Sequence, residues 1–263
     1  MDGYGKRQTP TAIKSNIVNQ FLLNLNPFNN QRVNTIRTPW GTINPDVDIF
    51  PVVYILFIYG IVYILPYGKE VIGISWFDWL RSEDGPLEWI QFIFFLMASI
   101  FSSLVVWKKS KRGVNTNWII WLIIALLCFF IAGEEISWGE RITGIGLDLL
   151  RDANKQGESN IHNLRFFHLY LLDPAFEISC LILGWIGWKS WPRFDALPTK
   201  RYSLYFLFVA FFFLYFDISY ASTIKQIRND QEIFETLMAI GLCAHSFQAI
   251  FESQRNKKQF RKE

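Results

Sequence analysis

The side chains best suited to chemistry follow directly after a long apolar run. The run extends from Trp118 to Phe130 without a proline or a charge. Two adjacent carboxylates, Glu134 and Glu135, come where a membrane helix of this length would end, and Glu140 and Arg141 follow within two turns. Ionisable groups at or inside a bilayer are costly and are rarely kept without a use. This stretch therefore predicts a functional site at the end of a membrane span.

Helical spacing indicates how these side chains would be arranged. Glu134, Trp138 and Arg141 are spaced i, i+4 and i+7, which places them on one helical face. Glu135 lies about 100° around the helix from Glu134, so the two carboxylates face different surroundings. We expect Glu134 and Glu135 to act as catalytic acids or bases, and Trp138 and Arg141 to bind substrate. The plain alternative is a polar helix end at the water interface.

A second polar stretch, residues 154–168, holds two of the three histidines in the chain. Glu158 and His162 are four residues apart, a spacing that suits two ligands of one metal ion. The same side chains suit acid–base chemistry without a metal, with His162 as the catalytic partner of the glutamates, and Arg165 is a candidate for binding an anionic head group. A polar loop that satisfies its own backbone is the alternative. The predicted ligands of a divalent metal are Glu135, Glu158, His162 and His168.

Other isolated polar residues lie in apolar surroundings. Asp217 follows a run of aromatic residues, needs a partner there, and is a further candidate for binding substrate. His245 stands alone in an apolar segment, so we expect it to be hydrogen-bonded to a neighbouring helix. The three cysteines have no metal-ligand spacing and are expected to be small buried side chains: Cys128, Cys180 and Cys243.

Composition assigns the chain to the all-α, multi-pass transmembrane proteins. It is 51% hydrophobic and 17% aromatic, and its apolar residues form blocks of about 18–23 residues, enough to cross a hydrocarbon core. Residues 1–48 form a polar tail, residues 49–251 a membrane domain, and residues 252–263 a basic tail. Residues 161–172 are too short to cross and predict an interfacial or re-entrant helix. The six predicted spans are 49–66, 87–107, 117–138, 174–188, 202–221 and 231–251.

Charge distribution predicts the orientation in the cell membrane. With both termini in the cytoplasm, the cytoplasmic segments carry 18 of the 26 basic residues and 6 of the 23 acidic ones. The short basic loop 108–112 counts most, because short loops near span ends set topology. Tryptophans at both ends of the spans form the expected aromatic belts. Nearly every acid at a span edge then lies on the outer side of the membrane.

Two motifs resemble a known group of proteins. The pattern Gly-Glu-Glu-Ile-Ser-Trp-Gly at residues 133–139, followed by the polar stretch 156–163, is similar to bacterial integral membrane proteins without assigned function. The resemblance implies that the two stretches belong together. It implies no activity.

Three classes of function fit these observations. The first is a membrane enzyme with its site at the outer face, acting on a lipid or a lipid-linked substrate. The second is a non-catalytic assembly or accessory subunit that binds a membrane-protein partner or a pigment. The third is an ion- or proton-coupled transporter, which would require carboxylates near the middle of the bilayer. No feature of the sequence points to nucleic acid.

Overall fold

The computed structural model describes residues 36–38, 41–43, 45–58, 73–82, 85–111, 117–146, 152, 173–191, 194, 196–218 and 230–259. The chain divides into two compact units, Met1–Pro45 and Asp46–Glu263. In the first unit, strands β1 (Ile36–Thr38) and β2 (Gly41–Ile43) pair antiparallel, with Ile36 opposite Ile43. This short hairpin lies within the segment that the sequence predicts as a polar tail.

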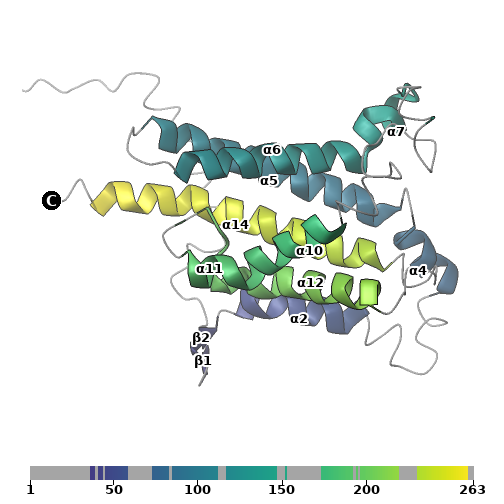
Figure 1. The fold of residues 1–263 in the computed structure, drawn as a ribbon, viewed down its shortest axis with the longest axis horizontal. Helices are drawn as coiled ribbons and strands as arrows, with labels where there is room; N and C mark the ends of the chain where they lie inside the picture. The colour runs from purple at the N-terminus through teal and green to yellow at the C-terminus, as the bar shows by residue number, and fades with distance from the viewer. Residues whose placement is uncertain are drawn as a thin grey trace, which may run out of the picture. The chain divides into compact units, whose positions relative to one another are not determined.

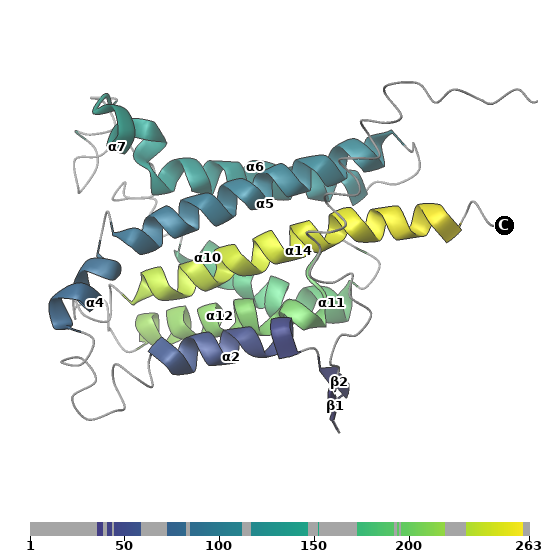
Figure 2. The same cartoon turned by 180° about the vertical axis from the view of Figure 1, so that it is seen from behind.

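The described part of the second unit is helical, as the sequence predicts. Its long helices lie side by side in Figure 1 and, seen from behind, in Figure 2. The elements are η1 (Pro45–Ile49), α2 (Phe50–Ile55), α4 (Ile74–Leu80), α5 (Pro86–Ser110), α6 (Asn117–Glu135), η3 (Ser137–Gly139), α7 (Glu140–Thr143), α10 (Asp173–Leu181), η5 (Ile182–Ile186), α11 (Gly187–Ser190), η6 (Lys200–Tyr202), α12 (Ser203–Ile218) and α14 (Gln231–Gln259).

Three described helices are long and apolar enough to cross a membrane: Pro86–Ser110, Trp118–Glu135 and Gln231–Phe251. Two shorter apolar helices, Val47–Ile58 and Ala175–Ile186, fall within or beside the predicted first and fourth spans. The predicted interfacial helix at 161–172 lies outside the described residues.

Two helix boundaries bear on the sequence predictions. Helix α5 begins at Pro86, as expected for a proline in a first turn, because proline lacks the N–H that a helix start leaves unused. Helix α14 continues to Gln259, so the start of the predicted basic tail, residues 252–259, is helical.

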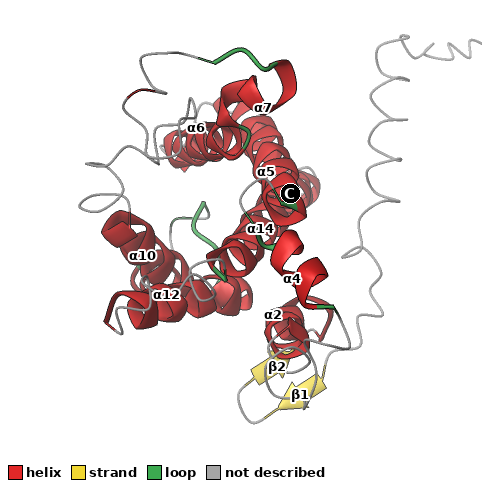
Figure 3. Ribbon diagram, turned by 90° about the vertical axis from the view of Figure 1, so that its right-hand side faces the viewer, coloured by secondary structure: helices red, strands yellow, loops and turns green. Residues whose placement is uncertain are grey.

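Helix α5 packs mainly against two helices, with a smaller contact to α4. It contacts α6 on one side and α14 on another, α12 packs against α14, and α10 packs against α12; Figure 3 shows this order looking along the helices. Ser99 Oγ donates to the carbonyl of Ala125 at 2.8 Å, and the hydroxyls of Ser102 and Ser246 lie 2.9 Å apart. Both serine contacts are buried, so these small residues join α5 to α6 and to α14 at close range.

One face of α5 is apolar and exposed along its whole length. The exposed residues recur every three or four positions, so they form a single stripe. Its end residues are 18 positions apart, which corresponds to five turns and about 27 Å of helix. We call this surface the α5 apolar stripe; it consists of Trp89, Ile93, Met97, Ile100, Leu104 and Trp107.

Candidate functional site

Helices α5, α6 and α14 bring their polar ends to one depth. Helices α5 and α6 run antiparallel, since Val105 shares a buried cluster with Trp121 and Ser99 bonds to Ala125, and the Ser99–Ala125 contact sets their register. Glu134 follows Ala125 by nine residues. It is therefore level with position 90 of α5, which precedes Ser99 by nine residues. The hydrogen bond between Gln91 and Glu232 places the start of α14 at the same level. Figure 1 shows these three helix ends together.

Glu134 is buried at the end of α6, where it is 4% exposed. The indole Nε1 of Trp138 donates a hydrogen bond to its Oε1. The indole folds back over Gly133, since a Cβ there would lie 2.9 Å from two carbons of the ring. The ring also makes edge contacts with Phe129 and Phe130, at centroid distances of 6.3 and 5.5 Å. A carboxylate at the end of an apolar helix is thus held by a defined donor.

The backbone after α6 turns sharply. Ser137 and Trp138 have φ of 47° and 54°, and Gly139 has φ of 89°. Left-handed backbone is unfavourable for residues with a Cβ by roughly 1–2 kcal/mol each, and it persists only where its surroundings impose it. We call Ser137, Trp138 and Gly139 the α6 elbow. The predicted continuous helical face from Glu134 to Arg141 is therefore wrong, because α6 ends at Glu135 and the elbow, not helical spacing, returns Trp138 to Glu134.

The α6 side of α5 also carries a buried acid. Glu88 precedes Ser99 by 11 residues, about three helical turns, so it lies on the face of α5 that meets α6. By the same register it is level with residue 136, at the elbow. Glu88 is 7% exposed and Ser137 is 1% exposed. Two polar residues from different helices are thus buried at the same depth as Glu134.

The α14 side of α5 carries an amide. Gln91 is fully buried, and its Nε2 donates to the carboxylate of Glu232 at 2.8 Å and to its carbonyl at 3.1 Å. Thr236 donates to the same carbonyl at 2.6 Å. We call these buried or half-buried polar side chains the polar layer: Glu88, Gln91, Glu134, Ser137 and Glu232.

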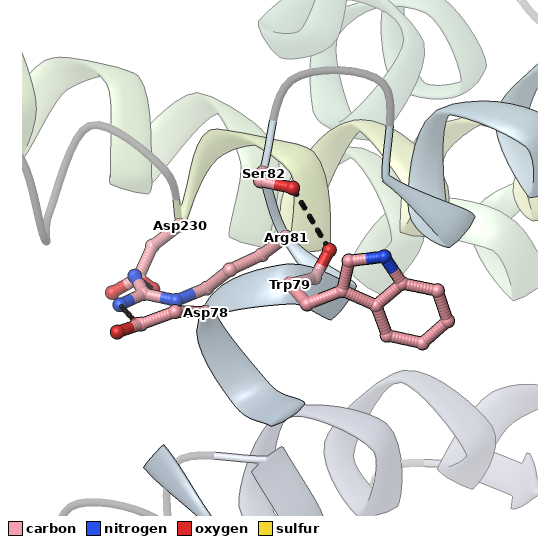
Figure 4. A network of polar contacts seen from close by, with 5 residues as sticks. All are labelled: Asp78, Trp79, Arg81, Ser82 and Asp230. Carbon is pink, nitrogen blue, oxygen red and sulfur yellow. Dashed lines mark hydrogen bonds and ion pairs between the residues drawn. The ribbon is translucent and has the colours of Figure 1, made fainter. Parts of the chain in front are cut away.

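A buried arginine lies beside the polar layer, at the start of α14. Arg81 is 1% exposed and bonds to the carboxylates of Asp230 and Asp78, the latter at 2.8 Å. Figure 4 shows its guanidinium between the two carboxylates. The guanidinium carbon also lies 4.6 Å from the centre of the Phe77 ring. Because Asp230 immediately precedes α14, this cluster fastens α4 to the first turn of α14.

The structure brings together some of the predicted site residues. Glu134 and Trp138 are in contact, and Glu135 is half-buried beside them. Arg141 lies in α7 and Asp217 near the end of α12, but their side chains are not described. Glu158, His162, Arg165 and His168 lie outside the described residues, so their roles stay predictions. Among the described residues, no group of three or more histidine, cysteine or acidic side chains is suitable for a metal ion.

Away from the site, the prediction for His245 is correct only in part. His245 is buried and its Nε2 lies 3.1 Å from the carbonyl oxygen of Ala196, but Ala196 belongs to a loop, so the predicted partner on a neighbouring helix is wrong. Its ring stacks on Trp121 at 5.2 Å. The three cysteines are free and buried, as expected.

The sequence offers weaker signals for Arg81, Asp230 and Gln91. Arg81 stands in the polar segment 81–84, which is typical of a solvated loop. Gln91 lies among apolar residues, and its position three residues after Glu88 is the one available hint, since both can face the interior of a bundle.

Comparison with protein-family models, with curated proteins and with solved structures gave no match. The resemblance in the Gly-Glu-Glu-Ile-Ser-Trp-Gly pattern stays a prediction. The polar layer is therefore the feature of the described chain from which a function can be inferred.

Proposed function

We propose that this chain is a multi-pass protein of the cell membrane, with about six spans, that binds and acts on a lipid or lipid-linked substrate at its outer face. The polar layer and the α6 elbow form the site. Glu134 is the general base or acid, with Glu135 and His162 as its partners. Arg141 and Arg165 bind an anionic head group, and Asp217 adds a polar contact to the substrate.

The α5 apolar stripe supports the membrane assignment. Its length of about 27 Å is close to the thickness of a hydrocarbon core, roughly 30 Å. A tryptophan ends the stripe on each side, where indoles favour the boundary between lipid and water. Lys108 and Lys109 follow Trp107 directly, and the Lys111 ammonium lies 4.1 Å from the centre of the Trp107 ring. That end belongs in the cytoplasm by the positive-inside rule, so the polar layer belongs outside.

One observation supports the proposed site most directly: Glu134 is buried next to a left-handed backbone that holds Trp138 against it. Strained backbone of this kind is concentrated at functional sites, because a packing role alone seldom requires it. Acids at a helix C-terminus also oppose the helix dipole, so a cluster there needs a use or a compensating partner.

The test compares lipids in membranes that contain the wild-type chain with those in membranes that contain variants. The enzyme proposal expects a lipid species that is formed or consumed with the wild type and unchanged with Glu134→Gln or His162→Ala. Glu140→Gln is the matched control, because Glu140 lies beyond the elbow in α7. Each variant is first checked for normal insertion and yield. Full conversion by both Glu134→Gln and His162→Ala would exclude the enzyme.

A second function is favoured by the pairing of polar groups with one another. Arg81 with Asp230, Gln91 with Glu232 and Trp138 with Glu134 each join two segments, as in a polar network that fixes helix register in an accessory subunit. A stoichiometric protein partner on gentle purification, with no bound metal and no lipid conversion, would favour this function. A transporter is disfavoured, because the acids of α5, α6 and the membrane-length part of α14 lie at one end of each helix.

A further inference from the structure

We propose that α4 is an interfacial anchor that lies in the lipid head-group region, with Trp76 and Trp79 as the side chains that enter it. The inference rests on the proposed function, which places α5 across the bilayer. It adds a lipid-binding surface that is separate from the polar layer.

The short helix α4 has two different faces. Phe77 is 5% exposed, and Arg81, just after the helix, is buried against Asp230. Trp76 and Trp79 are three residues apart, so they share the opposite face, where they are 58% and 53% exposed. Their rings meet edge to face at 5.3 Å. Two adjacent indoles held outward form an apolar patch with polar N–H groups, which suits a boundary between lipid and water.

The position of α4 along the bundle agrees with this boundary. Helix α4 lies beyond the start of α5, at an angle to the long helices (Figures 1 and 2). Trp89 is exposed near the start of α5 and begins the α5 apolar stripe. Helix α4 therefore lies next to the end of α5 at which the α5 apolar stripe begins, and the length of that stripe matches the hydrocarbon core. The Arg81–Asp230 contact keeps α4 at that depth by joining it to the start of α14.

Charge on α4 indicates which kind of lipid surface it meets. Ser75 and Asp78 are also exposed, and the carboxylate of Asp78 bonds to Arg81. Within the described segment 73–82, the single basic residue is Arg81, which is directed inward to Asp230. Attraction to anionic lipid needs outward basic residues. The surface that α4 binds is therefore the zwitterionic head-group region of the bilayer. The indoles of α4 make this contact, and charged side chains do not.

The experiment places a fluorophore on α4 and measures its depth. The variant Ser75→Cys is labelled with a polarity-sensitive dye, in a chain whose three native cysteines are buried. The protein is reconstituted in phosphatidylcholine vesicles that carry a nitroxide quencher either on the head group or deep in the acyl chain. Ile93→Cys, in the α5 apolar stripe, is the matched control for the hydrocarbon core. A second set of vesicles contains added phosphatidylglycerol.

We expect the label at position 75 to be quenched more by the head-group nitroxide, and the label at position 93 more by the deep nitroxide. Anionic lipid should change neither result. Trp76→Ser with Trp79→Ser should expose the label at position 75 to aqueous iodide.

Three outcomes overturn the proposal: quenching at position 75 by iodide alone, quenching there only with anionic lipid, or no effect of the double substitution. A failure at position 75 alone contradicts only the proposal for α4. If neither lipid quencher reaches the label at position 93, the proposed membrane function is wrong as well.

Discussion

At the scale of single residues, the Glu134 site depends on a small residue beneath a large one. The indole of Trp138 reaches Glu134 only because Gly133 has no Cβ. A hydrogen bond to a charged group contributes about 1.5–3 kcal/mol, so this donor can control how Glu134 binds a proton or a ligand. The glycine is therefore a positioning residue that acts on the Glu134 carboxylate through the Trp138 indole.

Gly133→Ala should reduce function without unfolding the chain. The new Cβ would lie 2.9 Å from the Trp138 ring, which is 45% exposed, so the ring can be displaced toward its exposed side at the cost of its bond to Glu134. Alanine in place of glycine in a helix interior adds up to about 1 kcal/mol of helix stability, which offsets part of the lost contact. We expect lipid conversion to fall about tenfold, as the loss of a charge-assisted hydrogen bond implies, and the thermal midpoint to change little.

Trp138→Phe is the comparator, because it keeps an aromatic ring and removes the donor. The two variants should lose conversion to a similar degree. Full conversion by Gly133→Ala, with conversion lost in Trp138→Phe, would contradict the positioning role of the glycine.

At the scale of elements, one buried ion pair joins α4 to α14. Arg81 and Asp230 are separated by most of the chain, and their side chains are 1% and 4% exposed. Asp78, the other partner of Arg81, is 53% exposed. The two aspartates therefore bond the same guanidinium from very different surroundings.

Asp230→Asn should destabilise the protein far more than Asp78→Asn. Removing one partner of a buried pair costs about 3–5 kcal/mol, because a charge stays buried without its counterion. Removing a surface partner costs about 0–1 kcal/mol. Thermal unfolding in detergent can be followed with a thiol-reactive dye, since the three cysteines are buried until the chain opens. Equal midpoints for the two variants would show that Asp230 contributes no more than a surface charge.

Sequence patterns predict elements better than the contacts between them. Pro86 marks the start of α5, and the apolar run that begins near Trp118 marks α6, because both signals are local. The α6 elbow escapes prediction, since Ser137 and Trp138 have no intrinsic preference for left-handed backbone. The burial of Arg81 could not be predicted from the sequence either, because it depends on a carboxylate 149 positions away. Contacts made across the chain leave little trace in local spacing.

At the scale of the whole molecule, the described helices separate acids from bases. The loop after α5 and the end of α14 are basic, and the opposite ends of α5, α6 and α14 carry the polar layer. The two ends of the α5 apolar stripe are about 27 Å apart, which is close to the thickness of a hydrocarbon core. The acidic and basic ends of the helices are therefore as far apart as the two sides of one bilayer. Under the proposed function, the positive-inside rule places the basic ends in the cytoplasm and the polar layer outside.

This orientation predicts opposite labelling of two cysteine variants in intact cells. Lys111 follows α5 at the basic end, and Ile145 follows α7 near the polar layer; both are exposed. A membrane-impermeant maleimide should label Ile145→Cys in intact cells, and Lys111→Cys only after the cells are made permeable. The wild-type chain, with its cysteines buried, should stay unlabelled. The reverse pattern would place the polar layer in the cytoplasm, and equal labelling of both variants would mean that α6 does not cross the membrane.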